Sequence, residues 1–262
     1  MPIGLFDPLT VMPAPRPRLP VVAGLLVLLP ALCGAASAPA ALAPADREAA
    51  RILGTASPQV RLVDARIRAR ADNAGRPFAI IDKSQARLFV YDAGGRLQGV
   101  APVLLGLARG DHSVPGIGER PIERVRPHER TTPAGRFAAR PGRNAGGEDV
   151  VWVDYASAVS MHRLRATDAS EHRPQRLATP SPADNRISYG CINMPPAFFD
   201  HVVRPLFARG PAAGGVVYVL PETRTPNAVF RELFEAPDAA GRSSAAIDAR
   251  AASRLQLARR AS

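Results

Sequence analysis

The chain has 262 residues, of which 34 are Lys or Arg and 23 are Asp or Glu, so its formal net charge is +11. A hydrophobic fraction of 46% beside 22% charged residues is an ordinary globular composition, which argues against a disordered chain, a collagen-like fibre and a polytopic membrane protein. The length suits one sizeable domain with appendages, or two small domains. Two cysteines are too few for a disulfide-stapled scaffold or a cysteine-built zinc site.

Residues 1–43 have the pattern of a signal peptide. Arg16 and Arg18 precede an apolar run at 21–32, and small residues rich in Ala follow it. One alternative is that the leader stays uncleaved and anchors the protein in a membrane, and no other membrane contact is expected. A second alternative is lipidation of Cys33. Cleavage near the end of this segment would leave Cys191 as the only cysteine of a protein exported to the periplasm or cell wall.

The stretch 44–76 is rich in Ala and Arg and is expected to form a helical extension. Val60, Leu62, Val63 and Ile67 are spaced to line its buried face. From Pro77 onward the spacing of apolar residues becomes typical of β-strands separated by short turns. The first three strands are expected to form a β-meander. Strands are predicted at 78–81, 88–91, 100–105, 135–139, 150–153, 158–161 and 216–220.

Two stretches lack periodicity, 106–133 and 163–186, and are expected to be irregular. A helix is predicted from Pro195 to about residue 208, because an apolar face follows a proline that suits a first turn. One more helix is expected at 227–234, within a C-terminal segment 223–262 whose tail is expected to be disordered. The fold class is therefore mainly β, with a packed helix after Cys191 and helical N- and C-terminal extensions.

Cys191 stands in the run Ser-Tyr-Gly-Cys-Ile-Asn at 188–193. A lone thiol outside the cytosol is either a buried small hydrophobe or a nucleophile. The glycine before it allows a sharp turn whose amides, those of Gly190 and Cys191, can hold an oxyanion. A nucleophilic thiol also needs a base, and His162 is the best placed, because it ends the predicted strand at 158–161. The other histidines are His112, His128, His172 and His201.

No two histidines have metal-ligand spacing on one predicted element, so no metal site is expected. Arginines are natural partners for carboxylates, and Arg163 and Arg186 flank the candidate catalytic residues. We therefore name both as candidate ligands of a substrate carboxylate, with solvated surface charge as the alternative.

Four segments in order carry a family resemblance. They are the run Ile-Ile-Asp-Lys-Ser-Gln-Ala-Arg-Leu-Phe-Val-Tyr at 80–91, Thr-Pro-Ala-Gly-Arg-Phe at 132–137, the strand-end His162, and the Ser-x-Gly-Cys-hydrophobic-Asn element at 188–193. Over residues 78–221 the chain resembles the catalytic domain of the L,D-transpeptidases (the YkuD domain), cell-wall enzymes of bacteria. We therefore expect residues 77–222 to form the catalytic domain.

The resemblance implies a β-rich sandwich fold, with Cys191 as nucleophile and His162 as general acid/base. It also implies that Ser188, Gly190 and Asn193 shape the site. The implied partner is the stem peptide of peptidoglycan, with a wall-anchored protein as another acceptor and no nucleic acid; the chemistry requires no cofactor. The implied process is peptidoglycan biosynthesis, which organises the cell wall and sets cell shape.

Two features depart from the family pattern. Tyr189 stands where the family usually has histidine, and the interval from His162 to Ser188 is longer than usual. A tyrosine hydroxyl can donate or accept a hydrogen bond but carries no charge near neutral pH. The extra residues, 167–186, fit a loop over the site, because the entropic cost of loop closure grows slowly with length.

Several functions remain open from the sequence. Attack by an amine on the Cys191 thioester gives an L,D-transpeptidase, and attack by water gives an L,D-carboxypeptidase. A non-catalytic wall-binding module of the same fold and a thiol hydrolase of ordinary peptides are further alternatives. A redox protein fits poorly, because Cys191 has no Cys-x-x-Cys companion.

Overall fold

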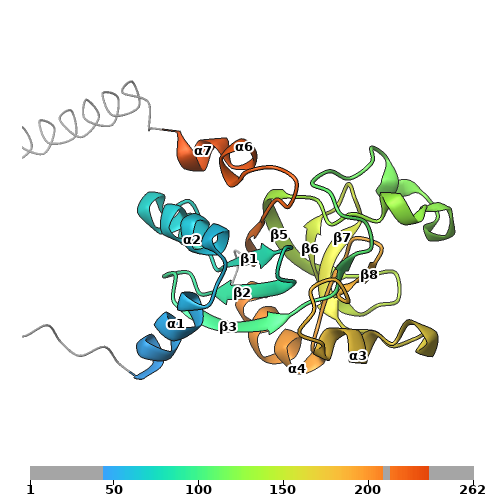
Figure 1. Ribbon diagram of the computed structural model, residues 1–262, viewed down its shortest axis with the longest axis horizontal. Coiled ribbons are helices and arrows are strands. Elements are labelled where there is room, and N and C mark those ends of the chain that lie inside the picture. The colour runs from blue at the N-terminus through green and yellow to red at the C-terminus, as the bar shows by residue number, and fades with distance from the viewer. Residues whose placement is uncertain (1–43, 209–212, 236–262) are drawn as a thin grey trace, which may run out of the picture. The chain divides into compact units, whose positions relative to one another are not determined.

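The computed structural model describes residues 44–208 and 213–235 (Figure 1). The predicted leader and C-terminal tail lie outside the described residues. The strands are β1 (Phe78–Asp82), β2 (Arg87–Tyr91), β3 (Leu97–Pro102), β4 (Leu105–Gly106), β5 (Gly135–Arg143), β6 (Asp149–Asp154), β7 (Val159–Arg163), β8 (Arg186–Ser188), β9 (Ile192–Met194) and β10 (Gly215–Val219). The helices are α1 (Pro44–Gly54), α2 (Pro58–Arg70), α3 (Arg173–Ala178), α4 (Pro196–Phe198), α5 (Arg204–Phe207), α6 (Pro226–Val229) and α7 (Arg231–Phe234).

Eight strands form one mixed sheet in the order β3-β2-β1-β10-β5-β6-β7-β9, and β4 pairs with β8 in a second sheet. The mainly β prediction is confirmed, and so is the meander, because β1, β2 and β3 are antiparallel neighbours. Within the eight-stranded sheet two neighbouring pairs are parallel, β1 with β10 and β7 with β9. The second of these pairs brings residues that are about 30 positions apart in sequence to adjacent strands, and these are the strands of the candidate site.

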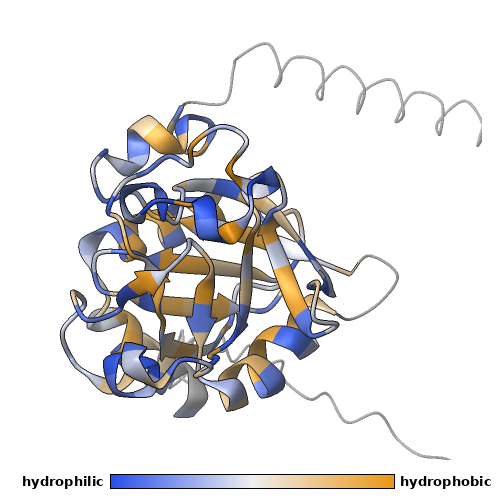
Figure 2. Cartoon of the chain, turned by 90° about the vertical axis from the view of Figure 1, so that its right-hand side faces the viewer, coloured by the Kyte–Doolittle hydropathy of each residue, from blue (hydrophilic) through white to orange (hydrophobic). Residues whose placement is uncertain are grey.

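The continuous apolar runs of β1, β2 and β10 follow from burial on both faces of the sheet. In β1, Ala79 and Ile81 enter one core cluster, whereas Phe78 and Ile80 enter the other. The same alternation holds in β2 and β10, as the period of two of a strand requires. Figure 2 shows apolar residues along the strands in the interior of the chain and many polar residues on the surrounding loops.

The two cores are covered by different helices. The helix predicted after Cys191 is confirmed as α4, a π-helical turn at Phe199–Val203 and α5, and it packs Phe199, Val203 and Phe207 into the first cluster. The second cluster receives apolar side chains from α2 and α7; in Figure 1, α2 lies beside β1, and α7 lies next to α2. No described helix is long and apolar enough to cross a membrane.

Several local predictions differ from the structure. The third strand occupies Leu97–Pro102, and the predicted remainder of its run belongs to β4. The N-terminal extension is two helices, because Ser57 caps a second helix after a break. Leu62 is 41% exposed, since it points away from the face formed by its predicted companions.

The two irregular stretches and the C-terminal segment also contain short helices. Three 3-10 turns, at Ile117–Glu119, Ile122–Arg124 and Pro127–Glu129, interrupt the first stretch. The second stretch holds another 3-10 turn, Ala169–Glu171, followed directly by α3. Phe230 separates the predicted C-terminal helix into α6 and α7, because its backbone leaves the helical region.

Candidate active site

The sheet places four polar side chains on one face. Residues alternate between the two faces of a strand, so Val159 and Met161 of β7 enter the core while Ser160 and His162 point the other way. In β9, Ile192 and Met194 are buried in the same core, which leaves Asn193, and Cys191 just before the strand, on the face of His162. The parallel register pairs His162 directly with Asn193.

Cys191 and His162 are close enough for each to shift the pKa of the other. The Nδ1 atom of His162 lies 2.7 Å from the carbonyl oxygen of Arg163. Because a carbonyl oxygen only accepts, Nδ1 carries the proton in this bond, which leaves Nε2 for the thiol. The sheet and one backbone carbonyl therefore fix both the tautomer and the direction of the imidazole.

The electrostatics of the pair favour a thiolate beside an imidazolium. Burial lowers the pKa of His162, but its bond to Cys191, the charge of that thiolate and the bond to the Arg163 carbonyl together raise the pKa above its ordinary value. Burial raises the pKa of Cys191, but the bond to His162 and its charge, with the contacts of Ser160, bring the pKa below the usual thiol value. Cys191 as a residue is neither fully buried nor fully exposed.

Ser160 is a site residue that the sequence prediction missed. Its Oγ lies 3.7 Å from the Cys191 sulfur, and its backbone N–H also contacts that sulfur. The sulfur lies 3.5 Å from the carbonyl oxygen of Ala158 as well. The signal was present in the sequence, because Ser160 is two residues before His162 and must share its face of β7.

The turn before β9 is held by its own side chains. The Ser188 hydroxyl donates to the carbonyl oxygen of Cys191 at 2.6 Å, and the Asn193 amide donates to the same oxygen at 3.1 Å. The N–H of Gly190 donates to Ser188 Oγ at 3.1 Å. The expectation that both amides of this turn hold an oxyanion is therefore corrected, because the Gly190 amide is occupied and the Cys191 N–H is the remaining candidate.

Gly190 adopts a φ of +128°, which L side chains rarely adopt, and a Cβ there would lie 2.8 Å from the carbonyl oxygen of Thr131. The neighbouring Thr132 hydroxyl donates to the Gly190 carbonyl at 2.8 Å and accepts from the Gly106 N–H at 2.9 Å. The segment Thr131–Thr132 thus lies directly against the nucleophile turn, and only glycine leaves room for it.

Replacing Gly190 with alanine is expected to lower the free energy of unfolding by about 1–3 kcal/mol, because backbone strain and the clash with Thr131 add. Urea denaturation measures the loss, and iodoacetamide labelling of Cys191 reports the displaced thiol. Gly54→Ala is the control, because a Cβ there meets nothing within 4 Å. Equal stability of the two variants would contradict the strained-turn explanation.

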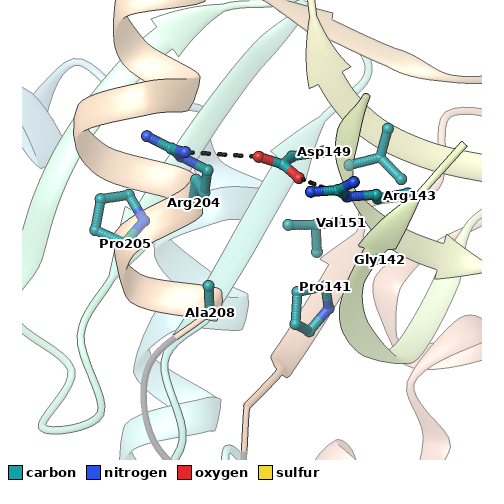
Figure 3. Close-up of a pocket in the computed structure, with 9 residues that line it drawn as sticks. Pro141, Gly142, Arg143, Asp149, Val151, Arg204, Pro205 and Ala208 are labelled. Carbon is teal, nitrogen blue, oxygen red and sulfur yellow. Dashed lines mark ion pairs between the residues drawn. The ribbon is translucent and has the colours of Figure 1, made fainter. Parts of the chain in front are cut away.

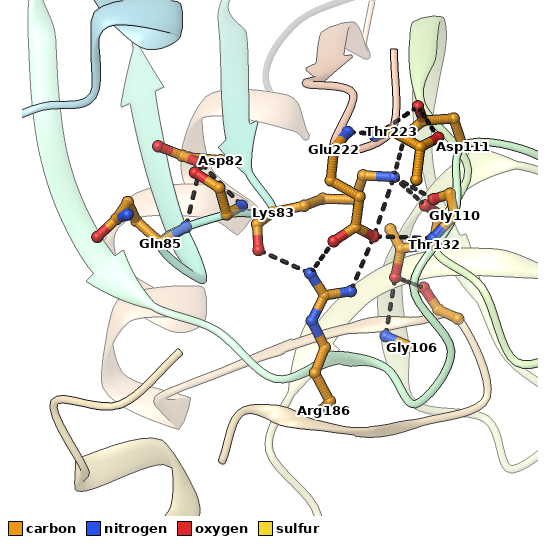
Figure 4. A network of polar contacts seen from close by, with 12 residues as sticks. Asp82, Lys83, Gln85, Gly106, Gly110, Asp111, Thr132, Arg186, Glu222 and Thr223 are labelled. Atoms are coloured by element: carbon orange, nitrogen blue, oxygen red, sulfur yellow. Dashed lines mark hydrogen bonds and ion pairs between the residues drawn. The ribbon is translucent and has the colours of Figure 1, made fainter. Parts of the chain in front are cut away.

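The structure does not support Arg163 and Arg186 as ligands of a substrate carboxylate. The guanidinium of Arg163 binds Asp200, with Nη2 and Oδ1 2.5 Å apart. Arg186 is 7% exposed, binds Glu222 at 2.6 Å and donates to the carbonyl oxygen of Lys83 at 2.7 Å (Figure 4). Both charges are already paired with carboxylates, Arg186 in a buried ion pair and Arg163 in a partly exposed one.

Two other arginines contact side chains of the 188–193 element. The Arg130 guanidinium stacks on the Tyr189 ring, with its carbon 3.8 Å from the ring centroid. From the insert, Arg173 donates to Asn193 Oδ1 at 3.2 Å and pairs with Glu171. The sequence carries no periodic signal for either position, because Arg130 follows a short 3-10 turn and Arg173 begins the six-residue helix α3.

A separate pocket of about 570 Å³ lies between the β5–β6 hairpin and α5 (Figure 3). Pro141, Val151 and Pro205 contribute apolar lining, and Asp149 bridges Arg143 and Arg204 at its edge, each at 3.5 Å. None of the candidate catalytic residues lines it. Among the described residues, no three His, Cys, Asp or Glu side chains gather in a way that suits a metal ion.

No family model and no curated protein matches the chain. Solved structures do match. The catalytic domain of the E. faecium L,D-transpeptidase is 18% identical, with a TM-score of 0.31 over 56% of this chain and 98% of that one. The LD transpeptidase LdtMt1, in complex with imipenem, is 18% identical, with a TM-score of 0.30 over 55% of this chain and 58% of that one. The helical cell shape determining protein Pgp2 from Campylobacter jejuni is 13% identical, with a TM-score of 0.37 over 57% of this chain and 49% of that one.

Two of these proteins are L,D-transpeptidases by name, which is the family that the four sequence segments resemble. The chain spans little more than half of LdtMt1 and about half of Pgp2. At TM-scores of 0.30 to 0.37 the likeness carries no argument about activity. A functional argument therefore depends on the site geometry and the motifs.

Proposed function

We propose that the chain is an exported cysteine acyltransferase, an L,D-transpeptidase that joins a peptidoglycan stem peptide to an amine. The observation that carries the proposal is the Cys191–His162 pair, with Nδ1 of the imidazole committed to the Arg163 carbonyl. A thiolate held beside an imidazolium is the nucleophile that acyl transfer through a thioester requires. The family resemblance assigns the same two residues to these roles, and the predicted leader supports a place in the periplasm or cell wall.

In the first half-reaction, His162 Nε2 takes the thiol proton and the Cys191 sulfur attacks the carbonyl of the L-centre before the terminal D-residue. The carbonyl oxygen becomes an oxyanion, and the Cys191 N–H is the donor we assign to it. The C–N bond then breaks, His162 gives its proton to the departing amine, and a thioester remains on Cys191. The Thr132 hydroxyl holds the Gly190 carbonyl, which belongs to the same peptide group as the Cys191 N–H, and so keeps that N–H in a fixed direction. Ser188 and Asn193 hold the Cys191 carbonyl on the other side of the nucleophile.

In the second half-reaction an amine attacks the thioester. His162 accepts the amine proton as the new C–N bond forms, and the Cys191 sulfur leaves as the thiolate. Water in place of the amine gives the carboxypeptidase reaction by the same steps. An amine prevails only where the site positions it and excludes water.

The deciding experiment is incubation of the protein with purified disaccharide tetrapeptide, followed by mass spectrometry. Crosslinked dimers are the expected product, and Cys191→Ala is expected to abolish them because no thioester can form. The same variant is expected to lose a covalent carbapenem adduct that the unaltered protein forms. Circular dichroism checks that it stays folded.

Other products would redirect the assignment. Tripeptide alone identifies an L,D-carboxypeptidase, and cleavage of casein with no reaction on the tetrapeptide identifies a general thiol hydrolase. Unchanged tetrapeptide, with sacculus binding retained in Cys191→Ala, identifies a wall-binding module and overturns the proposal.

A further inference from the structure

Arg130 and Tyr189 form a stacked pair beside the candidate nucleophile. The guanidinium carbon lies 3.8 Å from the ring centroid, and both side chains are half-buried. Tyr189 is two residues before Cys191, so the guanidinium is stacked on the same turn that carries the candidate nucleophile. Arginine over an aromatic face is a stable arrangement that keeps the edge of the guanidinium open to hydrogen bonding.

The backbone fixes Arg130 relative to the nucleophile turn. Its neighbours Thr131 and Thr132 lie against Gly190, through the close approach of the Thr131 carbonyl and the 2.8 Å bond from the Thr132 hydroxyl. The carbonyl of Arg130 itself accepts from the Ala108 N–H at 3.0 Å. The guanidinium is therefore presented by a held segment and not by a free loop tip.

The charge of Arg130 has no carboxylate partner among the residues that the structure describes. Its Nε donates to the carbonyl oxygen of Val125 at 3.3 Å, which sets the plane of the group. The neighbouring carboxylate, Glu129, is bound instead to Arg120 at 3.2 Å and to the N–H of Arg126 at 2.9 Å. With Nε occupied, the two Nη groups remain as a fork that matches the two oxygens of a carboxylate.

We infer that Arg130, held flat by Tyr189, binds a carboxylate of the stem peptide and so selects the substrate. The inference rests on the proposed function for the identity of the peptide. It also accounts for the tyrosine in place of the family's histidine, because Arg130 supplies there a positive charge that no pH change near neutrality removes.

The test measures binding of the stem tetrapeptide to the Cys191→Ala protein by calorimetry. The peptide is used with all its carboxylates free and with each carboxylate amidated in turn. Arg130→Met is expected to weaken binding of the free peptide about tenfold to a hundredfold, because a charge-assisted fork is lost. One amidated peptide is expected to bind the parent and Arg130→Met equally weakly, and Arg130→Lys is expected to recover only part of the affinity.

Arg124→Met is the matched control, because Arg124 is an exposed arginine of the same loop. It is expected to bind all the peptides as the parent does. Circular dichroism and iodoacetamide labelling of Arg130→Met, with Cys191 intact, show whether the fold and the nucleophile turn survive. A structural defect would weaken every peptide alike, including the amidated one.

The outcomes separate the inference from the proposed function. Equal affinity of the parent and Arg130→Met for the free peptide overturns the inference, and so does an equal loss for all the amidated peptides. If the unaltered protein still forms crosslinked product in that case, the proposed transpeptidase function stands and only the role of Arg130 is overturned. Carboxylate-dependent binding through Arg130 with no product from the unaltered protein supports the inference and overturns the catalytic proposal. No binding of any peptide by the parent overturns both.

Discussion

Replacing Lys83 with methionine is expected to lower the free energy of unfolding by about 3–5 kcal/mol, because breaking a buried ion pair leaves its partner charge unpaired. Lys83 is fully buried, and its Nζ lies 2.9 Å from Asp111 and 3.6 Å from Glu222 (Figure 4). Burial lowers the pKa of Lys83 and the two carboxylates oppose that shift. Methionine fills a similar volume, so the loss measures charge and hydrogen bonding more than packing.

The same substitution is expected to reach the candidate site. Lys83 Nζ donates to the carbonyl oxygen of Thr132 at 3.0 Å, and the hydroxyl of Thr132 holds Gly190. Faster iodoacetamide labelling or a shifted pH dependence of Cys191 would report the loosened turn. Urea denaturation gives the stability change, with Arg51→Ala as the control, because the Arg51–Glu48 pair is exposed and such pairs contribute little. A Lys83→Met protein as stable as the control would contradict this account of the network.

The alternation of apolar residues predicted most of the sheet, because strands buried on one or both faces leave a strong local signal. A strand end and a glycine turn are local features too, and they made His162 and Cys191 candidates from the sequence; the catalytic roles of both residues stay predictions. Their adjacency depends on the parallel pairing of β7 with β9, which has no local signal and came only through the resemblance. Ser160 was predictable from the period of two, and the prediction missed it.

The sequence does not show which arginine is free to bind a substrate carboxylate. Arg163 and Arg186 are adjacent to the motif along the chain, but adjacency does not show which carboxylate neutralises each one. Asp200 and Glu222 do so, from positions 37 and 36 residues away. Arg130 becomes a candidate only once folding lays its loop across Gly190. Long-range pairing decides which charges stay open to a ligand, and local patterns carry no record of it.

Replacing His162 with glutamine is expected to reduce crosslinking turnover by about 10²–10⁴-fold, the usual contribution of a general acid/base. It is also expected to slow alkylation of Cys191 by iodoacetamide at pH 7 by about tenfold or more, because the thiolate loses its imidazolium partner. The second readout needs no substrate, so it tests the pair independently of the proposed reaction.

The pH dependence of alkylation shows whether His162 lowers or raises the pKa of Cys191. Contacts with His162 and Ser160 outweigh burial and lower the pKa of Cys191, so the labelling midpoint of the unaltered protein is expected below that of an ordinary thiol. Glutamine keeps a hydrogen-bonding group but carries no charge, and burial then raises the pKa of Cys191, so the labelling midpoint is expected to move upward.

The alkaline limb of kcat/KM is expected above the ordinary imidazole range, because Cys191 raises the pKa of His162. His201→Gln is the control, as His201 is exposed on the helix after the cysteine, and a midpoint that stayed unchanged in His162→Gln would show that His162 does not activate the thiol.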